Sequence, residues 1–224
     1  MKKILFPILL FVLSLNASDS LDVVTIAGFK GGSGLAFFSS NISKAYKTEK
    51  PVISYDFGVF ASREYYQQLA LSLELLVRRR GGVHRTEYPL EAGQLEYRET
   101  GLNLLYVEMP IIVKFRIGDD WKYAPSIYAG LNPAFNISAK QTYEDEISSG
   151  ENELTSLESS DTGVIFGLEI WRKLGSNNLL IDFRLNSSLK LHTTDYMDAV
   201  GHSRGEYQFT TYGINMHIGY AFTL

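Results

Sequence analysis

The sequence predicts an all-β protein: an eight-stranded antiparallel up-and-down transmembrane β-barrel. Three observations predict it. Eight segments have strand character and lack helical periodicity, the connections between them alternate between long and short, and several strands carry one wholly apolar face. The chain has 224 residues, a length that suits one domain.

Composition narrows the function classes. Hydrophobic residues make up 45% of the chain, which is enough to form an apolar surface, and the net charge of −4 argues against a nucleic-acid binder. The chain has no Cys. Disulfides, thiol nucleophiles, thiolate zinc sites and a lipidated cysteine are therefore excluded.

The N-terminus has the layout of a secretory signal peptide. Lys2 and Lys3 precede an apolar run over residues 4–15. That run is shorter than the ~20 residues that a membrane-spanning helix needs. We expect cleavage after Ala17, which makes residues 1–17 a signal peptide and residues 18–224 the barrel domain. An uncleaved anchor is the alternative.

The eight strands justify the fold class by their spacing. The first, third, fifth and seventh connections have about 15 to 22 residues, and the others have about 4 to 6. Outer-membrane barrels show this asymmetry, with short periplasmic turns, long extracellular loops and both termini in the periplasm. The expected strands cover residues 23–30, 52–62, 68–79, 102–117, 122–141, 163–172, 179–191 and 207–224.

Alternation within the strands separates two faces. In the expected strand 102–117, one face is apolar, with Leu105, Val107, Met109, Ile111, Val113 and Phe115. The other face holds Tyr106, Glu108, Pro110, Ile112, Lys114 and Arg116. The expected strands 68–79, 122–141 and 179–191 alternate in the same way, and in the second of these Lys140 falls on the polar face.

A soluble lipocalin-like barrel would alternate too, with its apolar face inward. The apolar faces here continue for about 9 to 11 residues, the span that a tilted strand needs to cross a bilayer. The opposite faces mix small residues with both signs of charge, whereas a solvated face of that length would carry more Lys and Glu. These features favour the membrane.

Charged residues on the inward face are expected to pair, because eight strands enclose a space that side chains fill. We therefore predict a salt-bridged lumen, and a gated or very small conduit is the alternative. The predicted lumen network consists of Asp56, Glu74, Arg78, Glu108, Lys114, Arg116, Glu169, Asp182 and Arg184.

A second group of arginines falls where the expected strand 68–79 should leave the outer leaflet. Guanidinium groups suit lipid phosphates, so a contact with lipopolysaccharide is a hypothesis and plain solvation is its alternative. The group consists of Arg78, Arg79, Arg80, Arg85 and Arg98.

Two further features are expected to be structural. The fifth connection is acidic but matches no defined calcium loop, so we expect a solvated surface loop and no metal. It holds Glu144, Asp145, Glu146, Glu151, Glu153, Glu158 and Asp161. Tyr65, Tyr66, Trp121 and Tyr123 lie beside short turns and suit a periplasmic aromatic girdle.

An enzyme would need a site, and the histidines are His84, His192, His202 and His217. His192, Asp195, His202 and Ser203 could converge into a lipid-modifying hydrolase or acyltransferase. No Gly-x-Ser-x-Gly elbow accompanies them. We therefore expect solvent-exposed loop histidines, no catalytic residue and no cofactor.

The last residues resemble the β-signal that the barrel-assembly machinery recognises. A polar residue precedes a glycine by two positions, and hydrophobic residues then alternate to the end of the chain. An amphipathic edge strand of this kind can pair with another chain before closure. The residues are His217, Gly219, Phe222 and Leu224, with Leu in the last position where Phe is commoner.

Together these segments resemble the PorT-type outer-membrane β-barrel family, which is similar in architecture to OmpX-like and OmpA-like small barrels. The resemblance rests on residues 28–32, 71–82, 106–115 and 123–133. It implies a scaffold and carries no catalytic signature.

We therefore expect a non-enzymatic protein of the bacterial outer membrane with a structural or surface-interaction role. Its partners would be lipid, lipopolysaccharide and the assembly machinery, together with any extracellular ligand of the long loops. The rival hypotheses are an outer-membrane lipid-modifying enzyme and a soluble periplasmic lipocalin-like binder.

Overall fold

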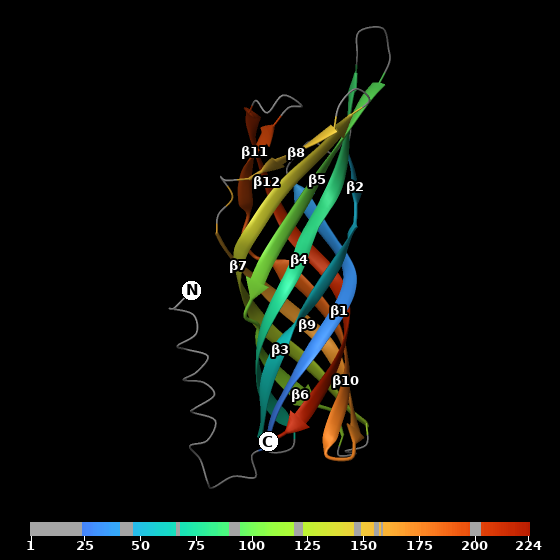
Figure 1. Ribbon diagram of the computed structural model, residues 1–224, viewed down its shortest axis with the longest axis vertical. Coiled ribbons are helices and arrows are strands. Elements are labelled where there is room, and N and C mark those ends of the chain that lie inside the picture. The colour runs from blue at the N-terminus through green and yellow to red at the C-terminus, as the bar shows by residue number, and fades with distance from the viewer. Residues whose placement is uncertain are drawn as a thin grey trace.

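The strands form one closed antiparallel barrel, so the predicted fold class is confirmed (Figure 1). The computed structural model describes residues 24–40, 47–65, 68–89, 95–118, 123–145, 149–154, 157, 159–197 and 203–224. The expected signal peptide lies outside them. The strands are β1 (Val24–Ser40), β2 (Lys47–Lys50), β3 (Val52–Tyr65), β4 (Leu69–Pro89), β5 (Leu95–Glu108), β6 (Ile111–Arg116), β7 (Tyr123–Asp145), β8 (Ser149–Glu153), β9 (Ser160–Leu174), β10 (Asn177–Ser188), β11 (His192–Met197) and β12 (Ser203–Thr223).

The described strands fill eight positions in the ring. The order is β1, β3, β4, β5, β7, β9, β10 and β12, and β12 pairs antiparallel with β1 to close it. Closure joins Ile26 to Thr223 at one end and Ser40 to Phe209 at the other. Because every ring strand has two neighbours, the ring has no open edge. In the described part of the chain, no helix has the length and apolar character needed to cross a bilayer.

The expected strand 102–117 is divided into β5 and β6. Pro110 has no N–H to donate to the ladder, so the pairing changes at this point. The neighbouring backbone groups nevertheless remain bonded: Met109 N donates to Pro133 O at 2.8 Å, and Glu74 N donates to Pro110 O at 3.0 Å. β6 continues between β4 and β7, the neighbours of β5, and so completes one position in the ring.

The long connections contain more strand than expected. β1 continues past Lys30 to Ser40, and β4 and β5 stay paired out to Pro89 and Leu95. β2, β8 and β11 add short pairings to β4, β7 and β12. Adjacent strands can satisfy each other's backbone groups beyond the bilayer as well as within it, so they continue as hairpins. These hairpins project from the end of the barrel opposite the C-terminus (Figure 1).

The short connections lie at the other end, as predicted. Gly118 and Gly175 follow β6 and β9 there with φ values of 85° and 65°. This left-handed backbone conformation favours glycine. The C-terminus lies at the same end, which the spacing of the connections identifies as periplasmic (Figure 1).

The two faces of the strands are arranged as the alternation predicted. Phe57, Ile127 and Ile214 are each more than half exposed on the outside, at 60%, 51% and 55%. Between such positions the side chains are buried, and many of them are charged. This arrangement is the reverse of a soluble barrel, so the lipocalin-like alternative is wrong.

We predict that a charge on the outer belt destabilises the barrel. Phe166→Lys places an ammonium group among acyl chains and should lower the free energy of unfolding by about 2–4 kcal/mol if the residue lies near the midplane. Urea titration of the protein folded into lipid vesicles measures this. The control is Thr142→Lys, on an exposed position of the β7–β8 hairpin. An equal loss in both variants would contradict the lipid-facing assignment.

Candidate functional site

The candidate site is the lumen, where charged side chains from seven ring positions meet. The network has seven carboxylates, six Lys or Arg side chains and two histidines. These are Asp56, Glu64, Glu74, Glu108, Asp161, Glu169 and Asp182; Lys30, Arg78, Arg80, Lys114, Arg116 and Arg184; and His192 and His217.

Glu74 of β4 lies at its centre. Its Oε1 is 2.6 Å from Nζ of Lys30, and its Oε2 is 2.8 Å from Nη1 of Arg184. The same two cations also contact Asp182, at 3.1 and 2.9 Å. The hydroxyl of Tyr128 donates a further hydrogen bond to Asp182. Two carboxylates and two cations are therefore held together by four ion contacts, and each of the four side chains is at most 1% exposed.

His217 of β12 links this centre to the extracellular half of the lumen. Nδ1 lies 3.2 Å from Asp182 Oδ2, and Nε2 lies 2.9 Å from Asp56 Oδ1. Gly32 lies opposite His217 on β1. A Cβ at Gly32 would come within 2.5 Å of the imidazole ring, so only glycine leaves room for it.

The network continues along β4. Arg78 contacts Asp56 at 2.7 Å and Glu108 at 3.2 Å. Arg80 contacts Glu108 at 2.7 Å and Asp161 at 2.6 Å. Consecutive inward positions on one strand therefore carry cations that share Glu108, which makes this part of the network a chain.

The periplasmic part of the network is shorter. Lys114 Nζ lies 2.8 Å from Glu169 Oε1, and the indole N–H of Trp171 also donates to Glu169. Nearer the mouth, Arg116 and Glu64 form an ion pair. These five side chains come from β3, β6 and β9.

Two apolar clusters pack against the network. The extracellular one contains Phe38, Leu102, Leu104, Tyr106, Ala134, Ala139, Leu154 and Phe209, with Leu157 packed against it. The periplasmic one contains Ile26, Phe60, Trp171, Leu180 and Ala221. Dispersion contacts therefore fill the parts of the lumen that the ion pairs leave.

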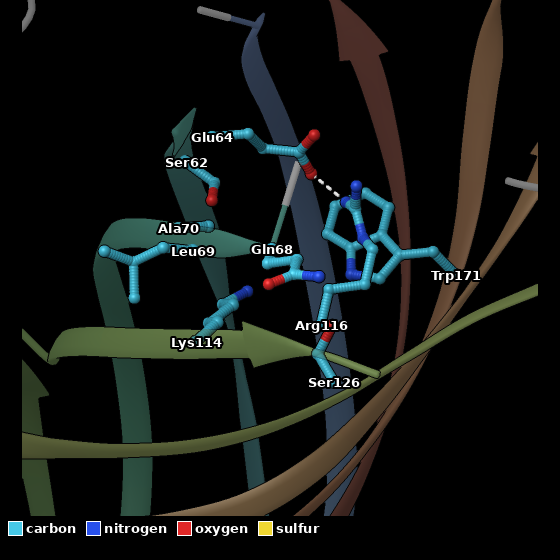
Figure 2. Close-up of a pocket in the computed structure, with 9 residues that line it drawn as sticks. All are labelled: Ser62, Glu64, Gln68, Leu69, Ala70, Lys114, Arg116, Ser126 and Trp171. Atoms are coloured by element: carbon cyan, nitrogen blue, oxygen red, sulfur yellow. Dashed lines mark hydrogen bonds and ion pairs between the residues drawn. The ribbon is translucent and has the colours of Figure 1, made fainter. Parts of the chain in front are cut away.

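The space inside the barrel becomes much smaller a short way in from the periplasmic mouth. A pocket of about 380 Å³ opens there beside Lys173 and Asn178 and reaches the Arg116–Glu64 pair and Trp171. Figure 2 shows the inner pocket beyond that pair, with Lys114, Ser126 and Gln68 around it. Its volume of about 10 Å³ is roughly that of a single water molecule.

Residues 25–191 match the family described as outer membrane protein beta-barrel domain, which is more than half of the chain. The chain belongs to this family. With the closed ring and the apolar outer belt, membership places the protein in the bacterial outer membrane. No curated protein matches the sequence.

Several solved structures are similar to the chain at low sequence identity. The outer membrane protease OmpT from Escherichia coli matches with a TM-score of 0.52 and 10% identity, over 93% of this chain and 99% of that one. OprG from Pseudomonas aeruginosa has a TM-score of 0.45 and 10% identity, over 91% and 96%. Ail of Yersinia pestis has a TM-score of 0.39 and 14% identity, over 88% and 98%. The OmpT likeness supports the barrel fold and nothing about activity.

All nine residues that were predicted to line the lumen belong to the ion network of this family member. Eight of them are at most 4% exposed, and Arg116 is partly exposed near the mouth. Sequence reasoning missed Lys30, Tyr128 and the link through His217. Lys30 was missed because β1 was expected to end there, although its alternation with Ile26 on the inward face could have found it.

The prediction that the five arginines form one outward-facing surface is wrong. Arg78 and Arg80 are 1% and 4% exposed and face inward. Residues two apart share a face of a strand, so Arg79 lies on the other face from both. Arg85 is half-buried, and the side chain of Arg98 lies outside what the structure describes.

Lys140 does not face the lumen as expected. Leu105 pairs with Ser138 and Tyr106 with Asn136, so Ile137 is an extra residue in β7. This irregularity reverses the alternation that follows it. Ala139 is consequently buried, and Lys140 is exposed and paired with Glu151 at 2.6 Å.

The fifth connection is not wholly a solvated loop. Asp161 is 3% exposed and belongs to the ion network, while Leu154 enters the extracellular apolar cluster. Glu144, Glu151 and Glu153 lie exposed on the β7–β8 hairpin. Asp145 has a described backbone only, and Glu146 and Glu158 lie outside the described residues. Among the described residues, no group of His, Cys, Asp or Glu could hold a metal ion.

The expectation of solvent-exposed loop histidines is wrong for His84 and His192, and His217 of the last expected strand is buried too. His84, His192 and His217 are all 0% exposed. His192 stacks on Phe209 at 5.3 Å and lies 3.5 Å from Asp161. His202 lies outside the described residues, and so do the side chains of Asp195 and Ser203.

The remaining predicted residues lie at the ends of strands. In the expected assembly signal, His217 faces the lumen, Gly219 is buried, and Phe222 and Leu224 are exposed. Tyr123 is 48% exposed at the start of β7, and Tyr65 ends β3. Tyr66 and Trp121 lie outside the described residues.

We predict that the centre of the network is needed for stability. Glu74→Gln leaves Lys30 and Arg184 with one carboxylate fewer in a dry interior, and it should cost about 3–5 kcal/mol. Equilibrium unfolding in vesicles measures this. The control is Glu99→Gln, which breaks the partly exposed pair with Lys50 and should cost about 0.2–1 kcal/mol. A loss at Glu74 no larger than the control would contradict the prediction.

Proposed function

We propose that this outer-membrane barrel is non-enzymatic and has a sealed lumen that serves as a rigid membrane anchor for its extracellular hairpins. The observation that carries the proposal is the continuous packing of the interior. The ion network packs against two apolar clusters, and the inner pocket near the mouth has a volume of about 10 Å³. A lumen packed in this way favours anchoring over transport.

The hairpins support the surface-interaction role. Strands β4 and β5 stay paired from Arg80 and Leu104 out to Pro89 and Leu95. Together with β2, β7 and β8 they form a sheet of five neighbouring strands outside the barrel. A paired sheet presents its side chains in a fixed arrangement, which suits recognition of a partner on the cell exterior.

His192 also lies in a buried group with Ser188 and Asp161, and this group does not have the arrangement of a hydrolase triad. Ser188 Oγ donates to Asp161 Oδ1 at 2.6 Å, so the serine bonds to the acid rather than to the base. In a hydrolase triad the serine bonds to the histidine and the acid orients the histidine. Arg80 also forms an ion pair with Asp161. The group therefore has the wrong order for nucleophilic catalysis.

Of the five arginines in the predicted group, we propose a contact with lipopolysaccharide only for Arg79. Its Nε donates to Asn103 Oδ1 at 2.8 Å, and its guanidinium carbon lies 5.9 Å from the centre of the Tyr55 ring. Tyr55 is 49% exposed on the outer face. A guanidinium group oriented in this way can bind a lipid phosphate.

Within the family, we infer a PorT-type barrel. Support comes from the segments quoted for the resemblance, which contribute to β1, β4, β5, β6 and β7 of the ring. The inference concerns the scaffold, and no secretion-related role is assigned to any residue.

The sealed lumen predicts no stable conductance. Purified protein in planar bilayers should give no large, stable steps, because the packed interior leaves no continuous water path. An open porin in the same bilayers is the positive control. Large, stable steps from the folded protein would overturn the proposal.

The non-enzymatic assignment predicts that His192→Ala leaves the lipid A profile of cells unchanged. Mass spectrometry of extracted lipid A, from strains with matched levels of folded barrel, checks this. A profile that differs between wild type and a deletion strain, and that His192→Ala fails to restore, would favour the lipid-modifying enzyme.

The lipopolysaccharide contact predicts that Arg79→Gln lowers the amount of lipopolysaccharide that co-purifies with the protein several-fold. Arg172→Gln is the control, because Arg172 lies over Tyr123 at 5.8 Å in a similar pair at the periplasmic end. Equal lipopolysaccharide in wild type and both variants would remove the proposal.

A further inference from the structure

The lipid-facing belt has a hollow on the side formed by β1, β3 and β4. It encloses about 440 Å³ and has an almost wholly apolar lining. Most of the belt carries large side chains, but here Ala27 of β1 and Ala61 of β3 pair directly across the two strands. Two neighbouring methyl groups replace large side chains, and the surface is depressed as a result.

Larger residues form the walls of this hollow. Phe29 and Val59 are the next lipid-facing pair along the same two strands, and both are 55% exposed. Phe222 flanks Ala27 on β12, and Leu73 flanks Ala61 on β4. The hollow therefore has two small residues at its base and bulky apolar side chains around them.

The division between β5 and β6 extends the hollow away from the chain terminus. Met109 lies beside Pro110 at this division and lines the far end of the hollow. The near end is lined by Phe222, next to the last residue of β12. The hollow thus forms a groove that starts close to the periplasmic end of the barrel.

We propose that this groove binds one acyl chain of a glycerophospholipid from the periplasmic leaflet. Within the hydrocarbon region an empty apolar groove would lose dispersion contacts, and water finds no polar partners there. The groove is continuous with the surface that already faces lipid. Its start near the periplasmic end selects the leaflet.

Arg63 follows Ala61 by two positions on β3, and its guanidinium carbon lies 5.7 Å from the centre of the Tyr65 ring. The residue is only 8% exposed, so it is not a ligand for the lipid headgroup. The proposal therefore rests on the shape, the apolar lining and the position of the groove.

The test is native mass spectrometry of the full-length barrel, extracted from outer membranes in mild detergent. Wild type should retain one glycerophospholipid. Ala61→Leu fills the base of the groove and should lower the bound fraction at least tenfold. Heat-modifiable gel mobility confirms that each variant is folded.

The matched control comes from the opposite side of the belt. Ala129→Leu adds the same bulk at an exposed lipid-facing position of β7 and should retain the lipid. If Ala61→Leu fails to fold, Ala27→Val offers a milder filling of the same base and should lower retention too.

Three outcomes would overturn the proposal. The first is equal phospholipid retention in wild type, Ala61→Leu and Ala27→Val. The second is lipopolysaccharide in place of phospholipid, lost on filling the groove. The third is a dimer that becomes a monomer on filling the groove, which would assign the surface to a second copy. Each is separable from the conductance result, because the groove lies outside the lumen.

Discussion

The structure depends on one constraint, the absence of water from the bilayer core. Backbone N–H and C=O groups inside hydrocarbon must bond to each other, and a sheet achieves this only when its first and last strands join. The long pairing of β1 with β12 is that join. Outward apolar side chains and inward polar ones follow from the same constraint, because each strand then has lipid on one side and a narrow, protein-filled space on the other.

The charges buried in the narrow interior help to specify the strand register. Burying a charge is expensive, and Glu74, Asp182 and Asp56 are tolerated because each meets more than one basic side chain. The partners come from strands far apart in the sequence. A shifted strand register would separate these pairs, so the network favours one register around the whole ring.

The barrel could be predicted because its signals are periodic and local. The alternation over residues 105–116 assigned Glu108 and Lys114 to the lumen without any knowledge of their partners. What failed depended on irregularities or on distant contacts. The extra residue Ile137 turned Lys140 outward, and the inward position of Arg80 was lost when three adjacent arginines were treated as one patch. Asp161 and Leu154 were assigned to a loop because nothing local indicates that the barrel mouth receives them.

His217 belongs to the final strand of the chain and also connects the two halves of the interior network. While β12 is unpaired, Asp56 and Asp182 lack this shared partner, and the opening beside β1 admits water. The link between the two halves of the network is therefore present only when β12 is paired in the ring. The polar position of the terminal strand thus has two roles: it belongs to the seam that closes the ring, and it joins two groups of ion pairs that would otherwise remain separate.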